Sequence, residues 1–409
     1  AERARELESA GATLLLGGLD EAVLSCDWCF VSPGVPLQHP LLVRARSHEL
    51  PLWNETGLLL ALCPSLTVGV TGSSGKSTTA ALVAEMGRAE CRRAFLGGNI
   101  GVPLLEKLDE MGPEDVVVLE LSSFQLQLAQ RSPRIAAITN IAPNHLDRHG
   151  SMEEYVSAKA SILRFQDALG VAVLNAADER CRGLAEQARG QVYWFGVGPA
   201  DRGAWLAGEE LVVAFGPGRE EAVCRREDLR LPGSHNVDNA LAACAVAAAM
   251  GLSTGTMAEA LRSFAGLPHR LELVAVIDGT NYYNDSVATT PERSIAGVRA
   301  MPGPVILLAG GRDKHLPWDG WVAEVRRRAK GVVLFGEAAD GLARVLASIG
   351  TPVERARDLE EAVALAREMA TGGDAVLFSP GGTSFDQFGD YAERGDRFRE
   401  LVLAMGSGR

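Results

Sequence analysis

The chain has 409 residues, of which 47% are hydrophobic and 22% charged, a composition typical of a globular protein with two or three domains. Its formal net charge of −12 argues against a general nucleic-acid binder, because such a protein needs a basic face to neutralise phosphates. The sequence shows no apolar run as long as a membrane span and no signal peptide, and its seven cysteines are scattered. We therefore predict a cytoplasmic protein with reduced thiols, no membrane span and no nucleic-acid partner.

Short β-rich runs alternate with helical patterns along nearly the whole chain, which favours α/β domains with parallel sheets. Helices are predicted near the start of the chain, at 153–166 and in the Ala-rich segment 237–250, and residues 204–216 predict a hairpin. The predicted strands lie, in chain order, within residues 26–34, 66–72, 114–124, 134–145, 171–178, 303–313, 330–336 and 374–388.

Residues 264–272 predict the main linker, because a Gly and a Pro there separate a helix from a new strand. The α/β rhythm starts again after this linker. We predict a short N-terminal domain at 1–55, a central domain at 56–266 and a C-terminal α/β domain at 267–409. The chain begins at Ala1 without Met, so we also expect an N-terminal piece to precede it.

The stretch TGSSGKST, residues 71–78, lies between a strand and an Ala-rich helix. A Gly-rich turn in this setting directs backbone N–H groups at an anion, and the helix dipole adds to the attraction. Lys76 can reach the β- and γ-phosphates of a nucleotide, and the Ser77 hydroxyl can bind Mg²⁺. The general pattern G-x-x-x-x-G-K-[ST] would place its first glycine at Val70, so this loop follows the shorter pattern T-G-x-x-G-K-[ST]. The predicted phosphate-binding residues are Gly72, Ser73, Ser74, Gly75, Lys76, Ser77 and Thr78.

Candidates for a metal site follow in the same predicted domain. Glu120 ends a buried strand, where carboxylates commonly complete a Mg²⁺ site, and an ion pair is the alternative. His145 and His149 are four residues apart, but no H-E-x-x-H is present, so a second metal or a substrate contact suits this loop better than zinc. Lys159, judged from its position in a helical pattern alone, is predicted to be a solvated lysine.

Taken together, these segments resemble the Mur ligase family, the ATP-dependent amide-forming enzymes of peptidoglycan assembly. The resemblance covers essentially the whole chain and rests on the order and spacing of its motifs. Within the family, SSFQL and SFDQF with R-G-x-x-F most resemble the members that add D-glutamate. The motifs are TGSSGKST, GGNIG (97–101), LELSSFQL (119–126), NHLDRHG (144–150), GSHNVDNALAA (233–243), LPHRLE (267–272), NDSVATT (284–290), GGRDK (310–314) and SPGGTSFDQFGDYAERGDRF (379–398).

The resemblance implies a three-domain α/β fold. The first domain would be Rossmann-like and would grip a uridine diphosphate, the central one would be a P-loop ATPase-like parallel sheet, and the third would be a Rossmann-like α/β domain that closes over the nucleotide and brings the amino acid. The family's opening strand and Gly-rich turn are not seen before Ala1, so the first domain is expected to be partial in this chain.

The resemblance also implies the reaction. The γ-phosphoryl group of ATP would pass to the carboxylate of UDP-N-acetylmuramoyl-L-alanine, and the amino group of D-glutamate would attack the acyl phosphate, releasing ADP and phosphate. Such transfer depends on positioning and charge neutralisation. Two Mg²⁺ ions are expected, with Ser77 and Glu120 at the first, His145 at the second, and Lys159 carbamylated into a carboxylate-like ligand. The residues given catalytic roles are Lys76, Glu120, His145, Lys159 and Arg270.

Further site residues are implied by the same match. The muramoyl substrate would be bound by Ser32, Gly34, Asn99, Ser122, Gln125 and His145. The nucleotide would also be bound by Asn236, Asn239, Arg270 and Asp285. D-Glutamate would be bound by Thr289, Lys314, Ser384, Phe385 and Tyr391. By residue type alone, the two aromatic residues fit a plain core equally well, and the lysine fits a solvated loop.

Two departures from the family pattern stand out. Members often read D-S-K-A-T where this chain has Val287 in place of the lysine, which removes a cation from the expected glutamate site. Ser74 replaces a usual asparagine in the phosphate loop. The alternatives are a related ligase for another amino acid, a folylpolyglutamate-type synthase, or a nucleotide-binding switch that forms no amide. A monomer is expected.

Overall fold

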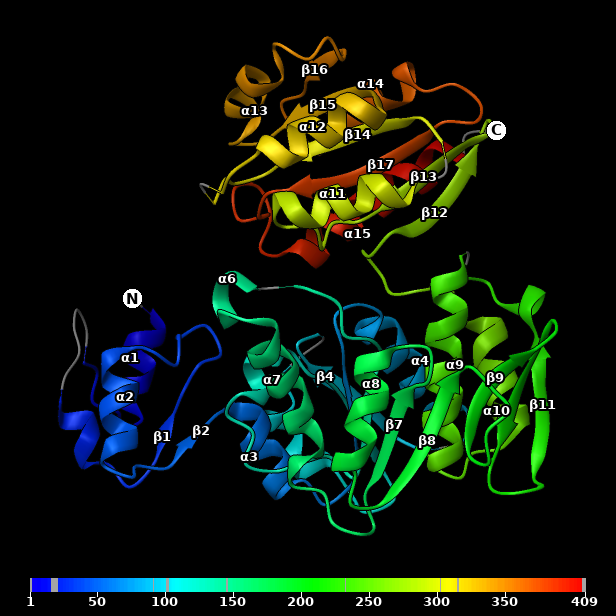
Figure 1. Ribbon diagram of the computed structural model, residues 1–409. Coiled ribbons are helices and arrows are strands. Elements are labelled where there is room, and N and C mark those ends of the chain that lie inside the picture. The colour runs from blue at the N-terminus through cyan, green and yellow to red at the C-terminus, as the bar shows by residue number, and fades with distance from the viewer. Residues whose placement is uncertain are drawn as a thin grey trace. The chain divides into compact units, whose positions relative to one another are not determined.

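The computed structural model describes residues 2–15, 21–90, 92–100, 103–144, 146–231, 233–301, 303–314 and 316–406 (Figure 1). Contacts divide the chain into two compact units, Ala1–Phe264 and Ala265–Arg409. The boundaries at 55/56 and 266/267 that the sequence predicts for three domains stay predictions. Within the described ranges, no helix combines the length and the apolar character needed to cross a bilayer.

The first unit begins with a small region around two short parallel strands. The sequence predicted a strand within residues 26–34, and only Cys29–Phe30 adopts it, paired with Leu52–Trp53. Its apolar core contains Val31, Leu42 and Leu52 and includes Leu128 from the following region. The elements of this region are α1 (Glu2–Ser9), η1 (Glu21–Ser25), β1 (Cys29–Phe30), α2 (Pro40–Ser47), β2 (Leu52–Trp53) and α3 (Glu55–Leu62).

A nine-stranded sheet forms the centre of the first unit, in the order β11-β10-β9-β8-β7-β6-β3-β5-β4. Strands β3 to β9 pair in parallel, and β9, β10 and β11 form an antiparallel meander, which includes the hairpin predicted at 204–216. The strands are β3 (Leu66–Thr71), β4 (Ala94–Gly98), β5 (Val116–Glu120), β6 (Ile135–Ile138), β7 (Val171–Asn175), β8 (Gln191–Gly196), β9 (Gly203–Ala207), β10 (Glu210–Ala214) and β11 (Glu220–Arg225).

Helices cover both faces of this sheet because its central strands are apolar on both sides (Figure 1). One face packs on α3 and α7 in a core with Leu119, Ile138 and Ile162. Helices α4 and α9 contact β5 and β8, respectively, and pack on each other. The remaining helices of the unit are α4 (Lys76–Ala89), η2 (Leu105–Glu110), α5 (Ser123–Leu126), α6 (Leu146–His149), α7 (Met152–Arg164), α8 (Glu179–Gly183), η3 (Leu184–Gln187), η4 (Arg226–Asp228), α9 (Ser234–Ala249) and α10 (Thr254–Ser263).

The second unit contains a six-stranded sheet in the order β12-β13-β17-β14-β15-β16, parallel except for the pair β12–β13. Apolar side chains on one face pack with α11, α12 and α13, and those on the other with α14 and α15, so this unit has three layers (Figure 1). Its elements are β12 (Glu272–Ile277), β13 (Thr280–Asn284), α11 (Pro291–Ala300), β14 (Val305–Gly310), α12 (Asp319–Arg328), β15 (Ala329–Phe335), α13 (Ala339–Leu346), β16 (Val353–Arg355), α14 (Leu359–Met369), β17 (Ala375–Gly381) and α15 (Tyr391–Gly406).

Candidate active site

The phosphate loop turns from the end of β3 into the start of α4. Gly72 and Gly75 have φ of 148° and 79°, a region that disfavours other residues. A Cβ on Gly72 would collide with Thr139 Oγ1, and one on Gly75 would collide with Asn239 Oδ1. The neighbouring strand end also braces the loop, because the amide of Ser74 donates to Asn140 Oδ1 at 3.0 Å. The loop therefore has the tight, fixed backbone that a phosphate cradle requires.

Glu120 lies beside this loop and is buried. The Ser77 hydroxyl donates to Glu120 Oε2 at 2.5 Å, and the Asn99 amide donates to Oε1 at 2.9 Å. The structure thus brings together the serine and the carboxylate that the sequence predicted as Mg²⁺ ligands, with an asparagine predicted for the muramoyl substrate. Both carboxylate oxygens accept from neutral groups, and no salt bridge to Glu120 is present among the described residues, although its charge acts on Lys159.

Lys159 is buried, so the prediction of a solvated helix lysine is wrong. Its Nζ donates to the Gly72 carbonyl at 2.7 Å and lies 4.6 Å from the centre of the Tyr155 ring. Lys76 Nζ donates to the same carbonyl at 3.0 Å. Burial, together with the repulsion from Lys76, lowers the pKa of Lys159 to about 7, so a large fraction of this amine is uncharged at neutral pH.

The oxygen donors beside the loop fit Mg²⁺, which prefers hydroxyl, carboxylate, phosphate and water oxygens. Within the ranges that the structure covers, no cluster of three or more His, Cys, Asp or Glu side chains could hold a metal alone. Phosphate oxygens and water would therefore have to complete any site at Ser77 and Glu120. His145, predicted for the second metal and the muramoyl substrate, lies outside the described residues.

Ser122 and Gln125 form a capping box at the start of α5, in which the Ser122 amide donates to Gln125 Oε1 at 2.9 Å. Asn54 holds the same turn by donating to the Gln125 carbonyl at 2.7 Å. These bonds give both predicted substrate residues a structural role and fix where they lie. Ser32 and Gly34 are exposed in the loop after β1.

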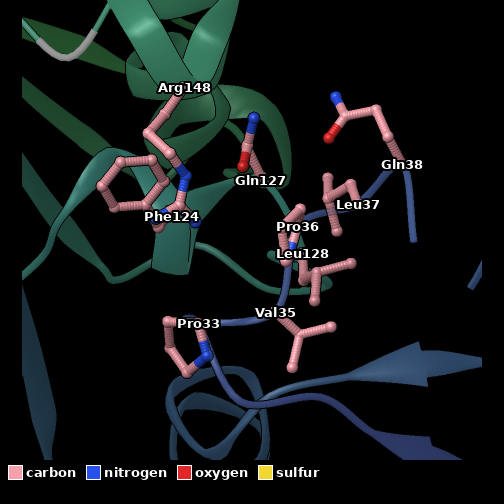
Figure 2. Close-up of a pocket in the computed structure, with 9 residues that line it drawn as sticks. All are labelled: Pro33, Val35, Pro36, Leu37, Gln38, Phe124, Gln127, Leu128 and Arg148. Carbon is pink, nitrogen blue, oxygen red and sulfur yellow. The ribbon is translucent and has the colours of Figure 1, made fainter.

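A small pocket lies between the loop that contains Pro33 and the α5 segment (Figure 2). Figure 2 shows Arg148 over Phe124 at one side of this pocket, with the guanidinium carbon 4.9 Å from the ring centre. Sequence reasoning gave Arg148 no role. Its position brings a cation to a pocket that is also lined by Pro33, the residue between Ser32 and Gly34.

The predicted nucleotide residues fall in both units. Asn239 lies against Gly75, and its amide donates to Asn236 Oδ1 at 3.1 Å, so α9 adds two asparagines near the phosphate loop. Arg270 and Asp285 belong to the second unit. Asp285 is buried and accepts from the Ser379 hydroxyl at 2.8 Å and from the Leu271 amide at 3.3 Å. Burial raises the pKa of this carboxyl to about 7 despite those bonds.

Three loops of the second unit, residues 285–289, 311–314 and 382–385, follow the ends of β13, β14 and β17, and we call them the edge loops. These strands are neighbours in the sheet, so the loops meet at one edge. The Gly381 amide donates to the Ala288 carbonyl at 2.8 Å, and Arg312 and Thr383 exchange two backbone bonds of 2.8 and 3.0 Å. The edge loops therefore bring the predicted glutamate residues Thr289, Lys314 and Ser384 to one region.

Arg394 forms hydrogen bonds with two of the edge loops and so holds them together, a role that the sequence did not predict. It is fully buried, and its guanidinium donates to the Ser286 hydroxyl at 3.0 Å, the Ser286 carbonyl at 2.9 Å and the Gly382 carbonyl at 3.1 Å. Burial lowers its pKa to about 10. The sequence signal that could have found Arg394 is its position as the first residue of the motif R-G-x-x-F. Phe385 and Tyr391 are 60% and 39% exposed, which excludes the plain-core alternative.

The chain matches two protein-family models. Residues 70–247 match the model described as "Mur ligase middle domain", and residues 269–382 match the one described as "Mur ligase, glutamate ligase domain". A relative from Symbiobacterium thermophilum, named UDP-N-acetylmuramoylalanine--D-glutamate ligase, is 43% identical over 409 residues, covering 99% of this chain and 90% of the relative. The chain belongs to the Mur ligase family. Members are ATP-dependent enzymes that form amide bonds, and the family predicted from the motifs is confirmed.

Solved Mur ligases share the fold. The UDP-N-acetylmuramate-alanine ligase MurC from Thermotoga maritima matches with a TM-score of 0.58 at 22% identity, covering 99% of this chain and 91% of that one. The MurF ligase from Thermotoga maritima, in complex with ADP, matches with a TM-score of 0.56 at 18% identity, covering 93% and 99%. The predicted α/β fold with parallel sheets is therefore confirmed as that of Mur ligases.

Proposed function

We propose that this chain is an ATP-dependent ligase that joins D-glutamate to UDP-N-acetylmuramoyl-L-alanine in the synthesis of peptidoglycan precursors, releasing ADP and phosphate. The observation that carries the proposal is the near full-length relationship, at 43% identity, to a ligase named for that substrate and amino acid. The geometry of the phosphate loop supports it, because the loop aligns a lysine, a serine and a buried carboxylate.

A carboxylate does not condense with an amine in water, so the L-alanyl carboxylate must first be activated. The phosphate loop would hold ATP through backbone N–H groups, and Lys76 would leave the carbonyls of Gly72 and Ser73 to neutralise the γ-phosphate. The acyl phosphate formed in this way is then open to attack by the amino group of D-glutamate. The protein's task is to position three charged substrates and to exclude water.

Ser77 and Glu120 would hold the first Mg²⁺, and His145 and Lys159 the second. When bound, these ions neutralise the charge that develops on the transferring phosphoryl oxygens. Lys159 would need to be carbamylated to serve as a ligand. Its neutral amine attacks CO₂, the new N–C bond forms, and one proton leaves to solvent, which yields a carbamate with one negative charge. The lowered pKa of Lys159 favours the amine form that this reaction needs.

The remaining assignments complete the proposal. Asn99, Ser122, Gln125 and the exposed loop with Ser32 and Gly34 would contact the UDP-muramoyl substrate, with Arg148 as an additional cation for its diphosphate. Thr78 and the nucleotide residues Asn236, Asn239, Arg270 and Asp285 would contact ATP, while Thr289, Lys314, Ser384, Phe385 and Tyr391 would contact D-glutamate. We also propose a cytoplasmic monomer with domains at 1–55, 56–266 and 267–409.

The test is a substrate-swap assay with the purified enzyme. Phosphate release from ATP should require both UDP-N-acetylmuramoyl-L-alanine and D-glutamate. Each substrate omitted alone gives the background rate, and D-glutamate is then replaced by L-alanine, L-lysine or meso-diaminopimelate. Equal stimulation by any of these amino acids would refute the D-glutamate assignment, and release without any acceptor would favour a nucleotide-binding switch.

A further inference from the structure

The segment 285–289 has Val287 where the family pattern D-S-K-A-T, on which the resemblance rests, has lysine, and the cation of Arg293 contacts this position. Arg293 Nη1 donates to the Val287 carbonyl at 3.2 Å. A single bond of this kind uses one of the five N–H donors of the guanidinium and leaves the others available. The side chain of Arg293 therefore lies at an edge loop while keeping most of its donors for another group.

The start of α11 holds Arg293 in this place. Thr290 is the N-cap and Pro291 follows it, which favours a helix that begins there. Ser294, the residue after Arg293, is buried. Its hydroxyl donates to the Ser379 carbonyl at 2.7 Å and accepts from Trp321 Nε1 at 3.0 Å. These bonds lock the first turn of the helix to the end of β17, so the position of Arg293 relative to the edge loops is fixed.

Lys314 is the second cation in this region. Lys314 ends the edge loop 311–314, which meets the loop contacted by Arg293 at the same edge of the sheet. Burial and, secondly, the charge of Arg293 lower the pKa of Lys314. Two other arginines of this unit form ion pairs, Arg299 with Glu324 and Arg312 with Glu337, each at 2.9 Å. Across the described ranges, neither Arg293 nor Lys314 forms a salt bridge with a carboxylate, although the charge of Arg293 reaches the buried Asp285 carboxyl, which accepts hydrogen bonds from Ser379 and Leu271. Two cations that form no salt bridge, one at the start of α11 and one on an edge loop, are suited to a ligand with two carboxylates.

We infer that Arg293 replaces the lysine missing at position 287 and binds one carboxylate of the incoming amino acid, while Lys314 binds the other. This inference rests on the proposed function and adds a specificity-determining residue to it. The guanidinium fork suits a carboxylate better than a single ammonium does, since it can form two parallel N–H···O bonds. An amino acid with one carboxylate would leave one of the two cations without a partner.

The test measures steady-state kinetics for Arg293→Ala. One lost charge-assisted bond is expected to raise the KM for D-glutamate about 30-fold, with kcat and the KM for ATP nearly unchanged. Arg293→Lys should recover part of this loss, and Val287→Lys added to Arg293→Ala should recover most of it. Arg299→Ala on the same helix is the matched control and should leave the KM for D-glutamate unchanged. Thermal unfolding of each variant separates binding from folding.

A second measurement uses D-glutamine, which lacks one of the two carboxylates. The ratio of kcat/KM for D-glutamate to that for D-glutamine should fall about tenfold or more in Arg293→Ala. A wild-type KM for D-glutamate in a folded Arg293→Ala variant would overturn the inference while leaving the proposed function intact. Failure of the wild-type enzyme to use D-glutamate at all would instead overturn the proposed function.

Discussion

The phosphate loop of the first unit and the edge loops of the second lie at comparable places in their sheets, where parallel strands end, but they are built differently. The phosphate loop is one continuous stretch of eight residues whose shape comes from two glycines and one helix start. The edge loops come from three segments spread over residues 285–385, joined by backbone bonds and by Arg394.

This difference separates two kinds of recognition. Phosphate is a generic group of nucleotides, and backbone N–H groups with a helix dipole suffice to bind it. An amino acid is chosen by the placement of individual side chains, which is the role that we propose for Lys314 and Arg293. Substitutions in the phosphate loop should therefore lower the rate of the chemical step, kcat. Substitutions in the edge loops should instead raise the KM for the amino acid.

The largest effect is expected for Lys76→Ala. Removal of the ammonium that would neutralise the γ-phosphate should lower kcat about 10³-fold, as for other preorganised charges at a transition state. Phosphate release and product formation measure this loss. Arg88→Ala, an exposed arginine of the same helix that pairs with Glu85, is the control and should keep nearly full activity. A loss confined to the KM for D-glutamate would contradict the division between the two regions.

Lys159→Ala should lower activity about 10- to 100-fold if the carbamate holds a metal ion. Added formate, acetate or propionate should restore part of the rate, because a short carboxylate can occupy the space that the side chain leaves. ¹³C NMR after equilibration with ¹³CO₂ should show a carbamate signal in the wild type and none in the variant. An unchanged rate in the variant would reject the metal-ligand role.

The phosphate loop could be predicted from sequence because all its determinants are local. The glycines, Lys76 and Ser77 follow a strand pattern and precede a helix pattern, and Glu120 ends the next apolar run. Their contact follows from the pairing of β3 with β5, since the carboxyl ends of adjacent parallel strands meet. Apolar runs also predicted the strands β6 and β7 of the first sheet and β14, β15 and β17 of the second, whereas β4, β8, β13 and β16 were not predicted.

The sequence could not predict which charged side chains are buried by contacts with segments far away along the chain. Lys159 lies in an ordinary helical pattern, and only the packing of α7 against the phosphate loop shows that it is buried and bonded to Gly72. Arg394 is also charged in sequence and buried in the fold, because its partners are 12 and 108 residues away. The placement of Arg293 over Val287 depends on a turn of helix that no motif encodes.

Arg394→Leu is expected to affect the edge loops without touching the phosphate loop. The carbonyls of Ser286 and Gly382 would lose their donors, which should lower the free energy of unfolding by about 3 kcal/mol. Arg394→Lys keeps one or two of these bonds and should remain folded, with a KM for D-glutamate raised about tenfold and an unchanged KM for ATP. Urea unfolding and steady-state kinetics measure the two effects. An equal rise of both KM values would indicate a general structural defect.

The smallest effect is a pH dependence of stability that arises from Asp285 at an edge loop. Burial raises its pKa to about 7 in the folded protein, whereas the carboxyl titrates near 3.8 when unfolded, so the folded state holds the extra proton between these values. The stabilisation is complete below about pH 3.8 and is lost as pH rises to 7.

The melting temperature of the wild type minus that of Asp285→Asn should therefore be larger at pH 5 than at pH 8. A constant difference at the two pH values would mean that Asp285 is ionised in the folded protein, and its charge would then have to be balanced by a cation such as Arg270 or Arg293.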